Sequence, residues 1–123
     1  MKHNIVWFDV PVLDLDRSIR FYAAVLGAPV TKMAVRDMTM GMLSTTDGGS
    51  MGCLVATEDF RPSADGIMVY FDVDGRLRDA VAQVRAHGGT VQRDIHPIGE
   101  HGFRAEVLDS EGNCIALHSR SDT

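Results

Sequence analysis

Hydrophobic and polar residues follow one another in an order that occurs twice along the chain. Residues 4–12 are rich in β-branched and aromatic side chains, which is typical of a strand. The next apolar positions have helical spacing and form one stripe: Leu15, Ile19, Tyr22 and Leu26. Three further segments have strand character, at residues 29–35, 38–46 and 50–57. The first half therefore predicts the order β-α-β-β-β.

Local signals predict where these elements begin and end. Asp14 precedes the apolar stripe and predicts a helix N-cap, since its carboxylate can accept a backbone N–H of the first turn. Gly27 follows the stripe and predicts the end of the helix, because glycine tolerates the left-handed conformation found there. The run Asp47-Gly48-Gly49 predicts the hairpin turn between the last two strands of this half.

The second half has the same pattern. Residues 67–73 predict a strand, and Asp74 predicts the N-cap of a helix that ends at Gly88. The apolar stripe of this helix contains Leu77, Val81 and Val84. Strand character then returns in three segments, at residues 90–95, 102–109 and 113–119.

The repeat predicts the fold class. Residues 7–10 (WFDV) in the first half are echoed by residues 70–73 (YFDV) in the second. A module of about 60 residues is marginal alone, so two modules are expected to complete each other. We predict an α+β protein in which two tandem βαβββ modules form a curved eight-stranded mixed sheet around a cleft. It is a single domain over residues 1–123, with module one at 3–57, a connection at 58–66 and module two at 67–119.

Composition narrows the function classes. Hydrophobic residues are 45% and charged residues 24% of the chain, which is typical of a soluble globular protein. A formal net charge of −5, without a cluster of Lys or Arg, argues against nucleic acid as a partner. No apolar run approaches the ~20 residues of a membrane-spanning helix, and the first residues lack the pattern of a signal peptide. Cys53 and Cys114 are too few for a disulfide framework, so a reduced, cytoplasmic protein is expected.

Several motifs resemble one known family. Residues 14–22 (DLDRSIRFY), followed by Leu26 and Gly27, resemble the first module of the vicinal oxygen chelate superfamily. This is the group of glyoxalases, bleomycin resistance proteins and extradiol dioxygenases. Residues 62–66, 98–103 and 109–119 look like a bacterial stand-alone, glyoxalase-like subgroup of it. The resemblance covers nearly the whole chain and is specific for the fold rather than for one activity.

The resemblance also implies where a metal ion would be held. Metal-dependent members hold one divalent ion with four His, Glu or Gln side chains, and the ion binds two neighbouring substrate oxygens. The resemblance places the four positions on Trp7, at or beside Cys53, on Met68 and on Ala116. Trp, Met and Ala cannot supply the oxygen or imidazole ligands that such an ion needs, and a lone Cys does not replace them. The sequence therefore predicts no metal and no other cofactor. Relatives are commonly homodimers, so a homodimer is expected here too.

Side-chain alternation predicts which residues share the cleft, since residues two apart in a strand point to the same face. The predicted ligand-binding walls are Trp7, Met68 and Tyr70, with Cys53 and Ala116 beside them. The predicted ionisable groups, with candidate catalytic roles, are Asp9, Asp72 and His118. Aromatic walls combined with carboxylates suit a flat or cationic organic ligand.

Each of these residues also has a purely structural explanation. Buried aromatic side chains are commonly part of a core. The carboxylates can be exposed strand residues or partners of an arginine such as Arg104. A histidine at a strand end, such as His118, can hydrogen-bond the backbone. His96, Glu100 and His101 lie around a predicted loop, where a lid contact or a peripheral metal site competes with simple solvation.

Three functions follow from these residues. The first is a binding module that captures a small organic molecule without the family's usual metal. The second is a glyoxalase-like lyase or isomerase that uses Asp9, Asp72 or His118 to move protons. The third is a metalloenzyme whose rearranged ligands are drawn from those same residues. The side chains at the family's metal positions favour the first function over the third.

Overall fold

The computed structural model describes residues 4–44 and 49–123. Within these residues, two successive βαβββ units are present, and a short 3₁₀ helix, η1 (Gly99–His101), lies in the second unit. The strands and helices of the first unit are β1 (Phe8–Pro11), α1 (Leu15–Leu26), β2 (Val30–Val35), β3 (Met38–Ser44) and β4 (Ser50–Val55). Those of the second are β5 (Tyr70–Asp72), α2 (Leu77–Ala86), β6 (Thr90–Pro97), β7 (Phe103–Leu108) and β8 (Cys114–Ser119).

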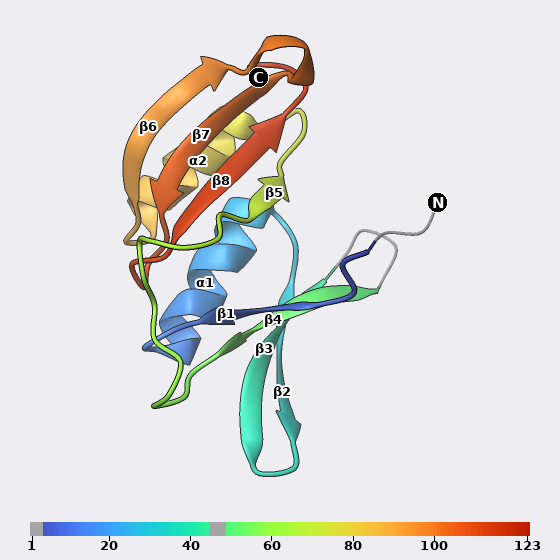
Figure 1. Cartoon of the computed structure of the whole chain (residues 1–123), viewed down its shortest axis with the longest axis vertical. Helices are drawn as coiled ribbons and strands as arrows, with labels where there is room; N and C mark the ends of the chain where they lie inside the picture. The colour runs from blue at the N-terminus through green and yellow to red at the C-terminus, as the bar shows by residue number, and fades with distance from the viewer. Residues whose placement is uncertain (1–3, 45–48) are drawn as a thin grey trace.

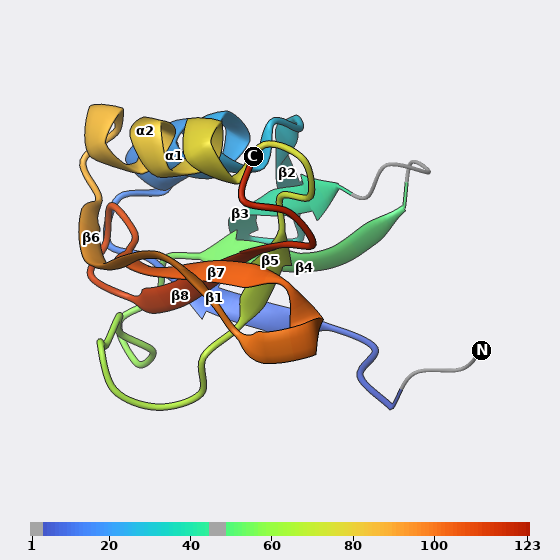
Figure 2. The same ribbon diagram turned by 90° about the horizontal axis from the view of Figure 1, so that it is seen from above.

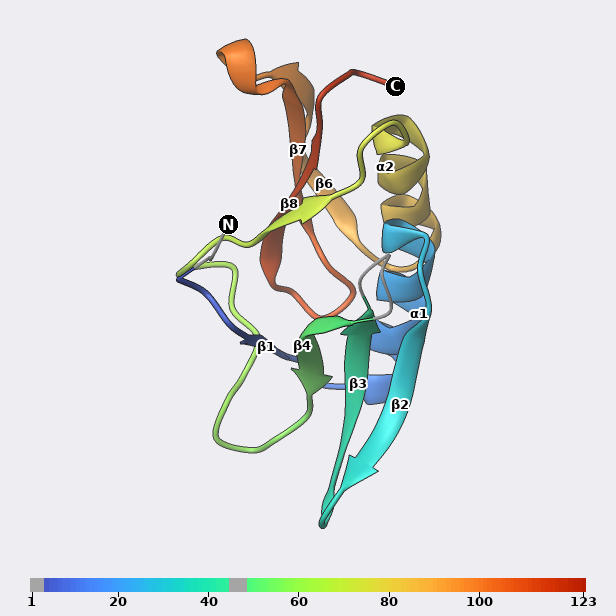
Figure 3. The same ribbon diagram turned by 90° about the vertical axis from the view of Figure 1, so that its right-hand side faces the viewer.

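The described strands are divided between two four-stranded sheets. Their orders are β1-β4-β3-β2 and β5-β8-β7-β6. In each sheet the first strand of the unit runs parallel to the last strand, and the other neighbours are antiparallel. Figures 1 and 3 show α1 and α2 next to each other on the same side of the molecule. The predicted α+β class with two βαβββ modules is therefore confirmed, and the eight described strands form two sheets of four rather than one continuous sheet.

The first helix begins and ends where the sequence predicts. Asp14 Oδ1 accepts the backbone N–H of Arg17 at 3.0 Å, which caps the first turn. Gly27 follows the helix with φ at 65°, the left-handed conformation that glycine adopts without strain. Neither α1 nor α2, the helices of the described residues, is long and apolar enough to cross a membrane.

The second helix begins differently from the prediction. Its N-cap residue is Arg76, which makes no side-chain capping bond, so the prediction of Asp74 as the cap is wrong. The Asp74 carboxylate instead accepts Nε and Nη2 of Arg120, at 3.0 and 2.6 Å. These bonds lower the pKa of Asp74 to about 2. Asp74 therefore binds Arg120, which is distant in sequence, instead of capping α2. Gly88 has positive φ, but α2 ends just before it, with His87 as its C-cap.

Most strand boundaries lie within a few residues of the prediction. β1 and β5 are shorter than predicted, and apolar residues predicted to begin these strands are exposed, with Ile5 77% and Ile67 94% exposed. β6 is longer and extends to Pro97. Of the predicted hairpin turn, Asp47 and Gly48 lie outside the described residues.

The hydrophobic core lies between the helices and the sheets and continues from one module into the other. Figure 2 shows both helices on one side of the strands. The Phe71 ring of β5 lies 5.9 Å from the Phe8 ring of β1 and 5.6 Å from the Tyr22 ring of α1, between centroids. Phe8 and Tyr22 belong to the first module and Phe71 to the second. The two modules therefore share one core, as a chain of this size requires.

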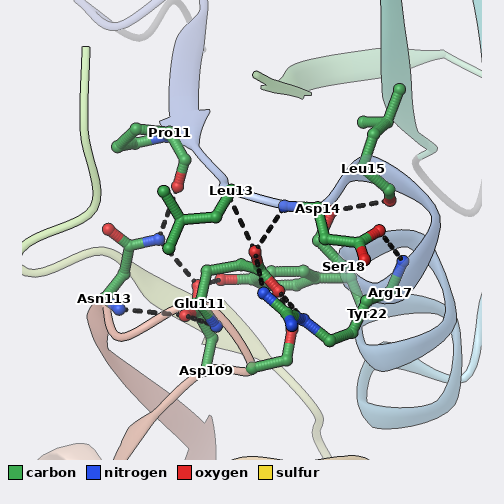
Figure 4. Close-up of polar contacts among 11 residues, drawn as sticks. Pro11, Leu13, Asp14, Leu15, Arg17, Ser18, Tyr22, Asp109, Glu111 and Asn113 are labelled. Atoms are coloured by element: carbon green, nitrogen blue, oxygen red, sulfur yellow. Dashed lines mark hydrogen bonds and ion pairs between the residues drawn. The ribbon is translucent and has the colours of Figure 1, made fainter. Parts of the chain in front are cut away.

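A buried carboxylate also joins the modules, at the turn between β7 and β8 (Figure 4). Glu111 Oε1 accepts the backbone N–H groups of Leu13 and Asp14, both at 2.8 Å, directly before α1. Arg17 donates to Oε2 and Oε1 of Glu111 at 2.7 and 2.9 Å. Burial alone would raise the pKa of Glu111, but the bonds from Arg17 and from the Asp14 backbone outweigh it and lower the pKa to about 2.

Asp109 and Asn113 extend this connection. The Tyr22 hydroxyl donates to Asp109 Oδ2 at 2.5 Å, and Asp109 Oδ1 accepts the backbone N–H groups of Glu111 and Asn113. Asn113 Nδ2 donates to the carbonyl oxygen of Pro11 at 2.8 Å. Burial and Asp109 raise the pKa of Tyr22 well above 10, so its hydroxyl keeps the proton that it donates. We call Asp109, Glu111, Asn113 and their partners in module one the polar joint.

We expect Glu111→Gln to lower the free energy of unfolding by about 2 kcal/mol, because it removes the charge that strengthens the hydrogen bonds accepted by this buried side chain, whereas Arg17 is 44% exposed and can be solvated by water. Urea unfolding at pH 7 measures this loss. Glu100→Gln is the matched control, since Glu100 is exposed in η1, and it should change the stability by less than ~0.5 kcal/mol.

The loss of stability in Glu111→Gln is expected to depend on pH. Because the pKa of Glu111 is lowered from 4.5 to about 2 in the folded protein, its stabilisation is present above pH 4.5 and is lost as the pH falls toward 2. The stability difference between wild type and Glu111→Gln should therefore shrink over this range. A difference that stays constant would contradict the ionised state assigned to Glu111.

Candidate functional site

Most predicted site residues lie on the sheet faces that the helices leave uncovered. In β1, Val10 is part of the core, so Asp9 points to the opposite side. In β5, Phe71 is part of the core, so Tyr70 and Asp72 point away from it. We call these two surfaces the open face of the first sheet, β1–β4, and the open face of the second sheet, β5–β8.

On the open face of the first sheet, three predicted residues contact one another. Trp7 Nε1 and Cys53 Sγ both donate to Asp9 Oδ1, at 3.1 and 3.2 Å. Burial of Cys53, which is 3% exposed, and its contact with Asp9 raise the pKa of the thiol to about 11. Cys53 is therefore protonated at neutral pH, which makes it a weak nucleophile and a weak metal ligand.

Strand register places the residues of the other open face in two rows that cross the second sheet. The first row contains Asp72, His118, Arg104 and His96. The second row contains Tyr70, Ala116, Glu106 and Arg93. The predicted residues of module two are thus brought together, except Met68, which precedes β5 and is half-buried.

The predicted acid–base groups are not joined to one another. Asp9 and Asp72 lie on different sheets, and no hydrogen bond connects them in the described part of the chain. Asp72 Oδ1 accepts the backbone N–H of Asp74 at 2.9 Å. His118 Nε2 donates to the carbonyl oxygen of His101 at 2.6 Å, since a carbonyl can only accept. His118 therefore makes the backbone hydrogen bond that a histidine at a strand end can form.

Arg104 contacts more residues on the open face of the second sheet than the sequence pattern indicates. Its Nε donates to His96 Nε2 at 3.0 Å, and its Nη1 donates to the Tyr70 hydroxyl. The guanidinium carbon lies 5.8 Å from the centroid of the Tyr70 ring. Nη2 forms an ion pair with Glu106 at 3.7 Å. The sequence signal for this site is the alternation within β7, which places Arg104 and Glu106 on one face.

A pocket of about 360 Å³ lies between the modules, where β1 and β8 meet the connection at residues 58–66. Its walls combine apolar side chains such as Phe8 and Ile67 with charged residues, which are Asp9, Arg61 and Asp65. Among the described residues, Asp9 is the one predicted site residue that lines it. Pockets of this size hold small organic ligands and often lie between structural units.

The residues around the predicted loop form no metal site. His96 lies in β6 and contacts Arg104, whereas Glu100 and His101 are exposed in η1. Within residues 4–44 and 49–123, no three His, Cys, Asp or Glu side chains are grouped so that they could hold a metal ion.

Comparisons with known proteins agree with the repeated βαβββ architecture. The family model for the Glyoxalase/Bleomycin resistance protein/Dioxygenase superfamily matches residues 4–117. This chain belongs to that superfamily. The resemblance identified from residues 14–27 is thereby confirmed. A search of curated proteins finds no match.

Solved structures of this superfamily share the fold. A glyoxalase/bleomycin resistance protein from Albidiferax ferrireducens T118 is 20% identical, with a TM-score of 0.75 over 96% of this chain and 99% of its own. A glyoxalase-related enzyme from Fulvimarina pelagi is 14% identical, with a TM-score of 0.72 over 96% and 88% of the two chains. The trypanothione-dependent glyoxalase I of Leishmania major is 25% identical, with a TM-score of 0.67 over 97% and 88%.

The side chains at the four positions where the resemblance predicts metal ligands do not fit a divalent ion. Trp7 offers an indole N–H, which only donates, and this group is bound to Asp9. Met68 offers a thioether, Ala116 is fully buried and has no donor atom, and Cys53 keeps its proton. A hard divalent ion prefers oxygen and imidazole ligands, and these four side chains supply none.

The raised pKa of Cys53 is testable in a Cys114→Ser background, where Cys53 is the remaining thiol. We expect the ultraviolet absorbance of its thiolate to appear with a midpoint near pH 11. Asp9→Asn should lower this midpoint, because it removes the negative charge beside the sulfur. Asp72→Asn, on the other sheet, is the matched control and should leave the midpoint unchanged.

Proposed function

We propose that this protein binds a small organic molecule between its two modules without the superfamily's usual metal ion. The observation that carries the proposal is the set of side chains at the four metal positions, Trp7, Cys53, Met68 and Ala116, on a chain that keeps the superfamily's fold. A fold can be retained while the chemistry of its site changes.

The pocket between the modules supports this proposal. Its volume of about 360 Å³ suits a small organic ligand. Phe60 and Ile67 line it and are 45% and 94% exposed, so a ligand that covers them would remove apolar surface from water. Asp9 and Arg61 supply polar groups that can orient the ligand.

The contacts of the candidate catalytic groups support binding rather than proton transfer. Asp9 already accepts two hydrogen bonds, Asp72 accepts a backbone N–H, and His118 donates to a backbone carbonyl. A general acid or base must instead reach a proton of the substrate. A glyoxalase-like lyase or isomerase would require these groups to leave their present partners.

The proposal also includes a cytoplasmic location and the classes of partner. Cys53 and Cys114 are both free thiols, which suits a reducing cytoplasm. The net charge of −5 disfavours nucleic acid and anionic membranes as partners. A small molecule and a second copy of the chain are the proposed partners.

An exposed apolar surface supports the homodimer. Met33, Val35 and Met38 are each at least 40% exposed, and the register of β2 with β3 places them on the open face of the first sheet. β2 is also an edge strand, with backbone groups available for pairing. An apolar face next to a free edge favours association of two copies.

The binding proposal is tested by metal analysis together with a ligand screen followed by NMR. Protein purified without chelators should contain far less than one divalent ion per chain, and EDTA should not change ligand binding. Ligands should shift the backbone amides of Asp9, Ile67 and Cys114, which line the pocket. An ion present at one per chain and required for binding would contradict the proposal.

A pair of variants tests the location of the bound molecule. Ile67→Lys should weaken binding at least tenfold, because the new charge lies at the pocket wall. Ile5→Lys is the matched control, since Ile5 is also an exposed apolar residue and does not line the pocket. Equal effects of the two variants would place the ligand elsewhere.

The homodimer is tested by light scattering coupled to size-exclusion chromatography. Wild type should have the mass of two chains, and Met33→Lys should shift it toward one chain by placing a charge on the apolar face. Ala34→Lys changes the neighbouring residue, which points to the other face of β2, and should leave the mass unchanged. A wild-type monomer at all concentrations would contradict the proposed dimer.

A further inference from the structure

A cationic side chain crosses the strand that carries the last of the superfamily's metal positions. Ala116 occupies this position in β8 and is fully buried. Tyr70 of β5 and Arg104 of β7 flank β8 on either side. The hydrogen bond from Arg104 Nη1 to the Tyr70 hydroxyl therefore spans β8 on the open face. A positive charge lies over the strand from which metal-dependent relatives would supply a ligand.

The Arg104 guanidinium is fixed in place before any ligand arrives. His96 Nε2 accepts the Nε–H of Arg104, so His96 Nε2 carries no proton. The other ring nitrogen, His96 Nδ1, donates to the carbonyl oxygen of Asp94 at 2.8 Å. The Tyr70 hydroxyl and ring hold the guanidinium from the other side. Its side chain is 22% exposed. A group held in this way loses little conformational freedom on binding, which favours affinity.

Arg104 nevertheless keeps hydrogen-bonding capacity for a ligand. Its Nη2 donates no hydrogen bond to any residue of the described chain, and its ion pair with Glu106, at 3.7 Å, is longer than a hydrogen bond. Glu106 also lies 3.7 Å from Arg93, so two guanidinium groups share this carboxylate. A planar guanidinium can direct parallel N–H groups at two neighbouring oxygens.

We propose that Arg104 replaces the metal ion as the fixed cation of this site and binds a small organic anion through two neighbouring oxygens. Carboxylates and 2-hydroxycarboxylates have this arrangement. Arg104 lies on the open face of the second sheet and does not line the pocket between the modules, so this anion site is a second position, which goes beyond the proposed function and rests on it only for binding without a metal ion. The anion replaces the cationic ligand suggested by the aromatic walls, because the Tyr70 ring already has a cation near it.

Mandelate is a suitable probe, because it combines a 2-hydroxycarboxylate with an aromatic ring. NMR titration should show that millimolar mandelate shifts the Arg104 Nε–H signal and the Tyr70 and Ala116 amides. The neutral 1-phenyl-1,2-ethanediol and the cation benzyltrimethylammonium should shift them far less. Arg104→Gln should weaken mandelate binding at least tenfold, and Arg104→Lys should restore part of it, because Lys keeps the charge without the planar fork.

Arg93→Gln is the matched control, because it removes the same charge from the same face at a side chain that does not contact Tyr70. It should change mandelate binding less than threefold, and thermal unfolding of each variant verifies that the fold is kept. The proposal is overturned if mandelate fails to shift the Arg104 signals, if Arg104→Gln binds it as wild type does, or if Arg93→Gln has the same effect.

The outcomes also separate this proposal from the proposed function. If the neutral or cationic probe binds in the pocket between the modules while mandelate leaves Arg104 unshifted, the Arg104 proposal fails and metal-free binding stands. If mandelate binds but EDTA abolishes its binding, a metal ion holds the anion, and both proposals fail.

Discussion

The start of α1 depends on a carboxylate that comes from the other end of the chain. The backbone N–H groups of Leu13 and Asp14 need acceptors, and the buried Glu111 supplies one oxygen to both. Arg17 then balances the charge of Glu111. The Glu111 side chain is fully buried, so its charge would be strongly destabilising without Arg17 and these two N–H groups. The orientation of the two modules follows from this requirement.

The open faces follow from the same arrangement. Because α1 and α2 lie on one side of the molecule, both sheets have their uncovered faces elsewhere (Figure 3). The two faces differ in character. The first is rich in methionine, whereas the second has rows of charged and aromatic side chains around Ala116. In our proposals the first face serves association and the second face serves ligand recognition.

Features that depend on local sequence were predictable, and features that depend on long-range contacts were not. The cap at Asp14 and the end of α1 at Gly27 follow from residues within one turn. Asp74 carries the same local signal, but Arg120 competes for its carboxylate. Arg93 and His96 are three positions apart, so simple alternation would place them on opposite faces. The bulges in β6 bring both residues to the open face. Simple alternation therefore does not predict the contact between His96 and Arg104.

The distance along the chain between the partners of the polar joint has a consequence for synthesis. Glu111 and Leu13 are 98 residues apart, and Asn113 and Pro11 are 102 apart. Contacts of such long range form late and slow the folding of small domains. On the ribosome, the first module would lack the contacts of the polar joint until the β7–β8 turn has emerged. During this interval its apolar surface would be exposed, so chaperones that bind nascent chains would have their longest opportunity at module one.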